Sequence, residues 1–125
     1  MHLSEFAQTQ IDIIHDLRQE NNDPTIGAST AQVKCIVIAL VSEVGEDYRI
    51  PALRSLIEAG GKFTSTKQLS LRDASVLIDW LYGGQTPGPH AQITPEALDT
   101  LHEIRSSLQG IAYQKEELDG TWILD

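Results

Sequence analysis

The chain is poor in cysteine, in long apolar runs and in positive charge. Its single cysteine, Cys35, excludes an intramolecular disulfide framework and any zinc site built from several cysteines. The longest apolar run covers only seven residues, 35–41, whereas a membrane-spanning helix needs about 20. No basic stretch followed by an apolar run stands at the start, so we expect no secretion signal. We therefore expect an acidic, soluble protein located in the cytoplasm, with no membrane contact.

Positive charge is scarce and is gathered in one stretch. The chain has 18 acidic and 9 basic side chains, for a net charge of −9. This acidity argues against general binding to the phosphate backbone of nucleic acids. Residues 49–72 nevertheless hold five basic side chains and one acid, and both flanking segments are acidic. The acidity favours a protein partner, and the basic middle leaves a weak contact with single-stranded DNA open.

Apolar side chains are present in sufficient number for one core. A chain of 125 residues with 41% apolar residues suits one compact domain and excludes wholesale disorder. Within residues 3–20, apolar residues recur near helical spacing, at Leu3, Phe6, Ala7, Ile11, Ile13, Ile14 and Leu17. We interpret them as the apolar stripe of one amphipathic helix.

The most apolar stretch is residues 33–44, whose β-branched side chains, taken alone, also fit a buried parallel strand. The ends of the stretch favour a helix. Ser29 and Gln32 have the spacing of a capping box, and Gly45 stands where a helix commonly ends. We predict a buried helix over residues 30–44.

Three further helices are indicated by their own start and stop signals. Residues 50–59 form one helix, and Ser70 with Asp73 opens the next. Thr94 caps the last helix, which we expect Gly110 to end. The prediction is an all-α fold, a compact bundle of about five helices over residues 1–110, followed at 111–125 by a C-terminal tail or short hairpin with an extended end. The overlapping apolar positions predict a shared core that contains Ile36, Leu40, Leu53, Leu77 and Leu81.

Residues 28–83 resemble a known helical module. The similarity rests on the helix start at residues 29–32, on Leu40 with Val44 and Gly45, and above all on residues 65–81, where Asp73 begins the most distinctive part. These residues resemble the small accessory domain that is appended to phage single-strand-annealing recombinases and related DNA-processing proteins. The resemblance implies an association with recombination or replication proteins, and it supplies no catalytic residues.

The loop at residues 60–67 contains glycines and a lysine but lacks the spacing of a phosphate-binding loop, because Phe63 follows Lys62 directly. A contact surface for single strands or other anions is the alternative reading, with the opposing interpretation that Phe63 fills the core and the lysines are solvated. The candidate nucleic-acid or anion contacts are Arg49, Arg54, Lys62, Phe63, Lys67 and Arg72.

The histidines and the cysteine carry no pattern of known chemistry. No two histidines have the i, i+4 spacing of a zinc site, and Cys35 lies in the most apolar stretch, where a thiol is ordinarily buried and inert. We expect no catalysis, no metal and no cofactor.

The last residues mix acids with large apolar groups. They could dock on a basic and apolar groove of a partner or pack back on the domain. The candidate docking residues are Glu116, Glu117, Trp122, Ile123 and Leu124. Together these features predict a non-enzymatic accessory or binding module of phage-type or mobile-element DNA recombination or replication. The alternative is an acidic interaction or inhibitor protein that mimics the charge of DNA toward a basic partner.

Overall fold

The computed structural model describes residues 3–20, 26–57, 65–85 and 91–119, and at 19–20 and 111–119 it describes the backbone only. The described residues form five α-helices and two short 3-10 helices, with no β-strand among them. The elements are α1 (Glu5–Glu20), α2 (Thr30–Val44), η1 (Glu46–Tyr48), α3 (Arg49–Ile57), η2 (Thr66–Gln68), α4 (Leu71–Tyr82) and α5 (Pro95–Asp119). The predicted all-α class is confirmed.

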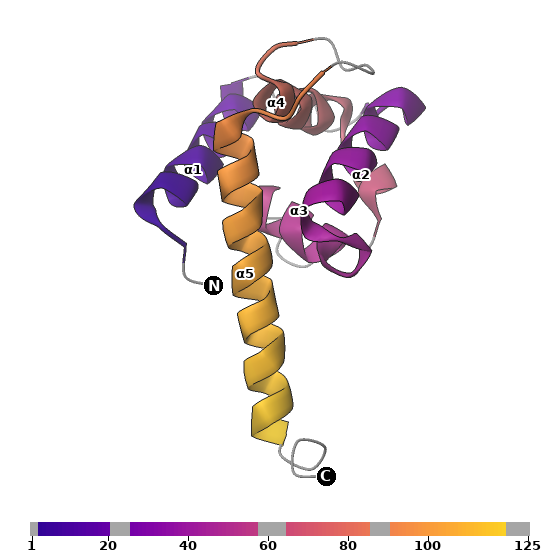
Figure 1. The fold of residues 1–125 in the computed structure, drawn as a ribbon. Coiled ribbons are helices and arrows are strands. Elements are labelled where there is room, and N and C mark those ends of the chain that lie inside the picture. The colour runs from indigo at the N-terminus through magenta and orange to yellow at the C-terminus, as the bar shows by residue number, and fades with distance from the viewer. Residues whose placement is uncertain (1–2, 21–25, 58–64, 86–90, 120–125) are drawn as a thin grey trace.

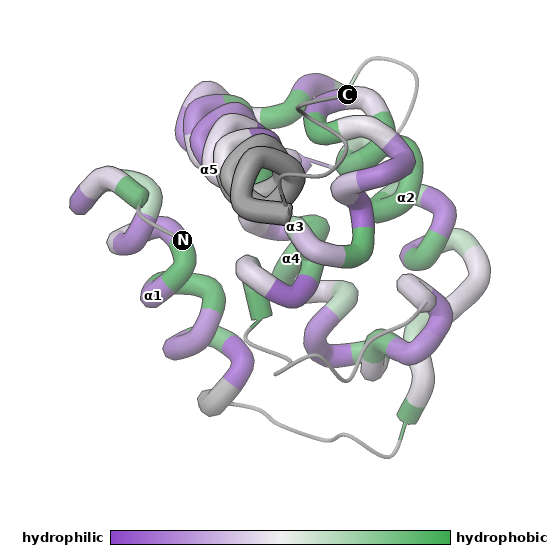
Figure 2. The backbone as a smooth tube through the Cα atoms, turned by 90° about the horizontal axis from the view of Figure 1, so that it is seen from below, coloured by the Kyte–Doolittle hydropathy of each residue, from purple (hydrophilic) through white to green (hydrophobic). Residues whose placement is uncertain are grey.

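The helices pack around the N-terminal half of α5. Helices α1 and α2 lie on opposite sides of α5, and α4 crosses the end of the bundle at which α5 begins (Figure 1). Figure 2 shows the same arrangement with α5 seen along its axis. Helices α4 and α5 each pack against both α1 and α2. Helix α1 therefore lies at the edge of the bundle, with one side against its neighbours and another side facing outward.

The core between these helices contains the residues that the sequence predicts. Ile36, Leu40, Leu53, Leu77 and Leu81 are each at most 1% exposed and belong to one cluster. Burial of a Leu or Ile side chain contributes roughly 1.5–3 kcal/mol, so this cluster accounts for much of the stability of the bundle. Helices α1 and α5 add further members, among them Ile11, Ile14, Leu101 and Ile104.

Three helix starts are formed by the capping residues that the sequence indicates. Ser29 Oγ accepts a hydrogen bond from the Gln32 amide, and the Gln32 side chain accepts one from the Ser29 amide, which completes a capping box. Ser70 Oγ accepts from the amide of Asp73 at 3.0 Å. Thr94 Oγ1 accepts from an amide in the first turn of α5. These hydroxyls satisfy donors that a helix start leaves without partners.

A short antiparallel bridge between Gly27 and Ser70 sets the starts of α2 and α4 side by side. The Ala28 amide donates to the Leu69 carbonyl at 3.0 Å, and the Leu71 amide donates to the Ile26 carbonyl at 2.7 Å. Nothing in the local sequence predicts this bridge, because its two halves are far apart along the chain.

The structure differs from the sequence prediction at the end of α5. We expected Gly110 to end this helix, but the helix continues to Asp119 and extends beyond the rest of the bundle (Figure 1). A glycine inside a helix costs only about 1 kcal/mol relative to alanine. The residues after it, such as Ala112, Gln114 and Lys115, are good helix formers and offset that cost. Residues 120–125, where we expected a turn and an extended end, lie outside the described residues.

The remaining boundaries agree closely with the sequence prediction. Helix α3 begins one residue earlier than expected, and its expected end at residues 58–59 lies outside the described residues. Among the described helices, none combines the length and the apolar character that crossing a bilayer requires.

Candidate functional site

Three large apolar side chains are exposed along one line of α1. Phe6, Ile13 and Leu17 expose 45%, 42% and 37% of their surfaces. They stand at positions i, i+7 and i+11, and this spacing brings residues to the same side of a helix. Single exposed apolar residues are common on proteins, whereas an aligned group marks a candidate interaction surface. We call these three residues the α1 stripe.

A second apolar side of α1 faces the core. Ala7, Ile11 and Ile14 are each at most 2% exposed and pack against neighbouring helices. The sequence prediction placed these residues and the α1 stripe in one continuous apolar face. The structure divides that face in two, because α3, α4 and α5 together cover only part of the circumference of α1.

An acidic edge runs beside the α1 stripe. Glu5, Asp12 and Asp16 are all exposed, and each directly precedes one residue of the stripe. Successive residues are about 100° apart around a helix. The acids therefore lie on one side of the stripe, and the core-facing residues lie on its other side. We call these three carboxylates the acidic edge.

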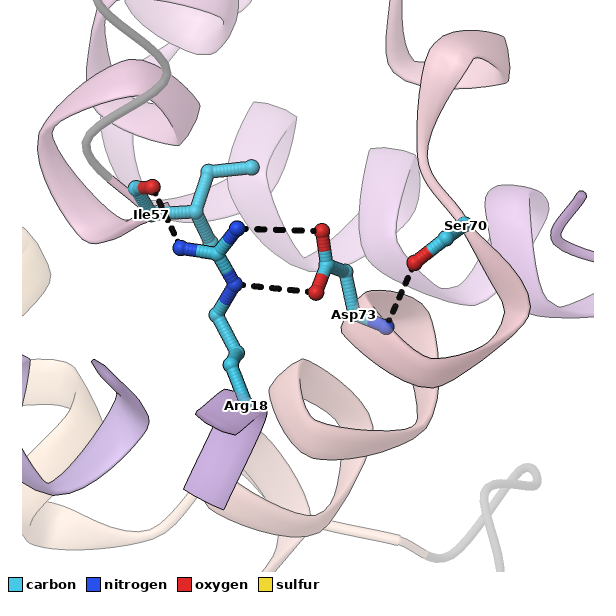
Figure 3. A network of polar contacts seen from close by, with 4 residues as sticks. All are labelled: Arg18, Ile57, Ser70 and Asp73. Carbon is cyan, nitrogen blue, oxygen red and sulfur yellow. Dashed lines mark hydrogen bonds and ion pairs between the residues drawn. The ribbon is translucent and has the colours of Figure 1, made fainter. Parts of the chain in front are cut away.

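Helix α1 is held near its C-terminal end by the guanidinium of Arg18, which binds groups of α3 and α4 (Figure 3). Arg18 Nε donates to Asp73 Oδ1 at 2.9 Å, Nη2 lies 3.4 Å from Oδ2, and Nη1 donates to the Ile57 carbonyl at 2.6 Å. This geometry uses the planar fork of the guanidinium to join α1, α3 and α4. It also gives a donor to the carbonyl of Ile57, the last described residue of α3.

The same network explains why Asp73 makes only half of the expected capping box. Its amide donates to Ser70 Oγ, but its carboxylate binds Arg18. The Asp73 side chain is 12% exposed and the Arg18 side chain 29%, so water screens this pair less than a surface pair. The sequence does not predict this pair, because the two residues are 55 positions apart.

Two more contacts fix α1 along its length. At the start, the Ser4 amide and hydroxyl donate to the two carboxylate oxygens of Glu103 in α5, at 3.0 and 2.7 Å. In the middle, Trp80 Nε1 of α4 donates to Gln10 Oε1 at 2.9 Å. Because α1 is held at its start, middle and end, the α1 stripe occupies a defined position on the bundle.

The basic residues that the sequence singled out have different surroundings. Arg49 donates to Thr66 Oγ1 at 2.6 Å and forms an ion pair with Glu46 at 3.0 Å, so its charge already has partners within the bundle. Lys67 is exposed in η2. Arg54 and Arg72 are half-buried, on α3 and α4. Lys62 and Phe63 lie outside the described residues. Contact of this group with single-stranded DNA stays a prediction.

The candidate docking residues of the C-terminal end also stay a prediction. Glu116 and Glu117 belong to the part of α5 where only the backbone is described. Trp122, Ile123 and Leu124 lie outside the described residues.

Shallow hollows open on the described surface. One of about 360 Å³ lies between α2 and α4 and is lined by Ala31, Gln32, Cys35, Ser75, Ile78 and Asp79. Cys35, which we expected to be buried, is half-buried there. Burial raises the pKa of the Tyr82 phenol, and the Cys35 thiol raises it to a smaller extent.

Another hollow, of about 410 Å³, lies between the start of α1 and α5 and is lined by Ser4, His102, Glu103, Ser106 and Ser107. His102 Nε2 lies 2.8 Å from Glu43 Oε2, which links α5 to α2. In the part of the chain that the structure describes, no three His, Cys, Asp or Glu side chains are grouped to hold a metal ion.

Comparison of the chain with protein families, with curated proteins and with solved structures gave no match.

The sequence predicts that the residues of the α1 stripe belong to an amphipathic helix, but it does not predict that they are exposed. A signal for it was present: apolar residues occupy too wide an arc of residues 3–20 for one buried face, and an acid precedes each member of the stripe.

Proposed function

We propose that this protein is a non-enzymatic helical accessory module that binds another protein through the α1 stripe. The observation that carries the proposal is the alignment of Phe6, Ile13 and Leu17 on the exposed side of an anchored helix. An aromatic side chain with two aliphatic ones supplies apolar anchors of the kind that helix recognition uses. Because α1 is already ordered, binding there costs little conformational entropy.

The proposed setting is phage-type or mobile-element DNA recombination or replication. Support for it comes from the resemblance of residues 28–83 to the accessory domain of single-strand-annealing recombinases. Helix α1 precedes that stretch, so the α1 stripe would be an additional binding surface on such a module. A neighbouring gene for an annealing protein, an exonuclease or a single-strand-binding protein would support this setting.

A protein that mimics the charge of DNA is the second candidate. The net charge of −9 and the regular spacing of Glu5, Asp12 and Asp16 favour it. A mimic of this kind would compete with duplex DNA for its partner, whereas an accessory module would leave DNA binding by the partner intact. Adding duplex DNA to the purified complex therefore separates the two functions.

The proposal is tested by quantitative affinity capture from a lysate of the source cells. The wild-type chain is compared with Ile13→Asp, which places a charge in the α1 stripe, and with Ile38→Asp, which places the same charge at an exposed apolar position of α2. We expect a partner that the wild type and Ile38→Asp capture equally and that Ile13→Asp loses. Equal capture by all three variants would contradict the proposal.

A further inference from the structure

The spacing along the α1 stripe is that of a helix-to-helix contact. With the half-buried Gln10 included, the outer side of α1 runs through residues 6, 10, 13 and 17, with steps of four, three and four. Steps of three and four align side chains along a seam into which a second helix packs its own side chains. At about 1.5 Å per residue, the seam is about 17 Å long, or roughly three helical turns. A partner helix of similar length matches it.

Gln10 adds a polar position in the middle of the seam. Its Oε1 accepts a hydrogen bond from Trp80 Nε1, and this contact fixes the orientation of the amide because an indole nitrogen can only donate. The amide NH₂ group, which can donate two hydrogen bonds, takes no part in that contact. A single polar position within an apolar seam selects the register of a helix pair.

The charge beside the seam indicates the chemistry of the partner. The acidic edge, formed by Glu5, Asp12 and Asp16, borders the seam on the side away from the core. A helix with lysine or arginine beside its apolar side chains would place positive charge opposite these carboxylates. The chain as a whole carries a net charge of −9, so a basic partner is attracted from a distance.

A second copy of this chain fits the same surface poorly. Two antiparallel copies of α1 related by a two-fold axis would place one acidic edge against the other. Each copy also carries a net charge of −9, which opposes self-association at low salt.

We propose that the α1 stripe receives an amphipathic helix with a basic edge from a partner protein. This inference rests on the proposed function and specifies the partner that the site selects. It is a helix-to-helix type of recognition, with apolar anchors three or four positions apart and cations along one side.

The probe is a synthetic helix of about 14 residues, built from leucines at heptad positions and lysines elsewhere, with a fluorescent label. Two analogues serve as controls: one replaces every lysine by glutamate, and the other replaces every leucine by alanine. Fluorescence anisotropy measures the affinity of each peptide for the full chain and its variants, and circular dichroism checks that each variant keeps its helical content.

We expect the leucine–lysine helix to bind and both analogues to bind at least about tenfold more weakly. Ile13→Gln should weaken the binding of the leucine–lysine helix by about tenfold, and Ile38→Gln should leave it unchanged. The double variant Asp12→Asn with Asp16→Asn should weaken binding and flatten its dependence on salt. The two aspartates attract the lysines of the peptide, and salt screens this attraction because the Debye length falls from about 10 Å at 0.1 M salt to about 3 Å at 1 M salt. A variant without these charges has less attraction for salt to screen.

Three results would overturn the inference: equal binding of the glutamate analogue, equal loss of binding in Ile38→Gln, or no binding of the leucine–lysine helix. A concentration-dependent dimer in sedimentation that Ile13→Asp abolishes would also overturn it, in favour of a second copy. If the peptide fails and Ile13→Asp still loses a partner from the lysate, the basic-helix inference is wrong and the proposed function stands.

Discussion

Helices α1 and α2 both expose apolar side chains, but they expose them in different arrangements. Helix α2 is the more apolar of the two by sequence, and its Ile38 and Val41 are 57% and 36% exposed. These two residues are three positions apart, and the exposed charge near them is Lys34. On α1 the exposed residues extend over three turns, with a row of acids beside them. The two helices therefore differ in the alignment and the neighbouring charge of their exposed apolar side chains, and this difference is the reason why we propose the docking surface on α1 and not on α2.

The largest expected effects are on the free energy of unfolding, and they come from comparing a buried isoleucine with an exposed isoleucine of the same helix. In α1, Ile14 is fully buried and Ile13 is 42% exposed; in α2, Ile36 is fully buried and Ile38 is 57% exposed. Ile14→Ala and Ile36→Ala should each lower the free energy of unfolding by about 2–5 kcal/mol. Ile13→Ala and Ile38→Ala, at the exposed positions, should each lower it by less than about 1 kcal/mol. Urea unfolding measures all four variants. A cost for Ile13→Ala equal to that for Ile14→Ala would show that the α1 stripe belongs to the core.

The next effect concerns the attachment of α1 alone. Arg18→Met should lower the free energy of unfolding by about 2 kcal/mol, because it leaves the Asp73 carboxylate and the Ile57 carbonyl without their donor. Amide hydrogen exchange should become faster in α1 and stay unchanged in α2. Arg105→Met, at an exposed position of α5, is the control. Equal acceleration in α1 and α2 would mean that the network does not act locally on α1.

The parts of the fold that the sequence predicts well are those determined by nearby residues. Ser29 with Gln32, Ser70 and Thr94 act within one turn of their own positions, so their patterns are sufficient to locate three helix starts. The long apolar sides of α2 and α4 also indicate their burial, whatever their neighbours are.

The parts that the sequence does not predict depend on distant residues. Whether Phe6 and Ile13 are buried depends on how far α3, α4 and α5 extend around α1. The Asp73 carboxylate could bond to the start of its own helix, but it binds Arg18, a residue 55 positions away. The continuation of α5 past Gly110 depends on whether the helix-forming residues after it offset the cost of the glycine, which is about 1 kcal/mol. The glycine alone does not determine that outcome.

A smaller effect tests the end of α5, the helix that lies between α1 and α2. Gly110 lies within the helix, and a Cβ added there meets no atom within 4 Å. Gly110→Ala should therefore raise the free energy of unfolding by about 0.4–1 kcal/mol. Gly83 has a φ of +61° after α4, and a Cβ there lies 2.9 Å from Thr94 Cγ2, so Gly83→Ala should destabilise the fold. Thermal unfolding compares the two. Destabilisation by Gly110→Ala would restore the sequence prediction that this glycine ends the helix.

A loss of stability at alkaline pH tests the burial of Tyr82, the last residue of α4. Burial first, and the Cys35 thiol second, raise the pKa of Tyr82 above its ordinary value of 10.0. A raised pKa in the folded state favours the protonated phenol, so this contribution to stability is fully present below pH 10.0 and decreases as the pH rises through the folded-state pKa. Wild type should lose more stability than Tyr82→Phe above pH 10.0. Parallel curves for the two proteins in urea unfolding would contradict this.

The central claim is that α1, and not α2, carries the docking surface. An amide chemical-shift map of the ¹⁵N-labelled chain during titration with the leucine–lysine helix tests it most directly. We predict that the largest shifts fall on residues 6–17, and that Gln10 and the indole N–H of Trp80 shift with them because the two side chains share a hydrogen bond. Shifts centred on residues 34–41 of α2, or on the basic residues 49–72, would contradict the claim.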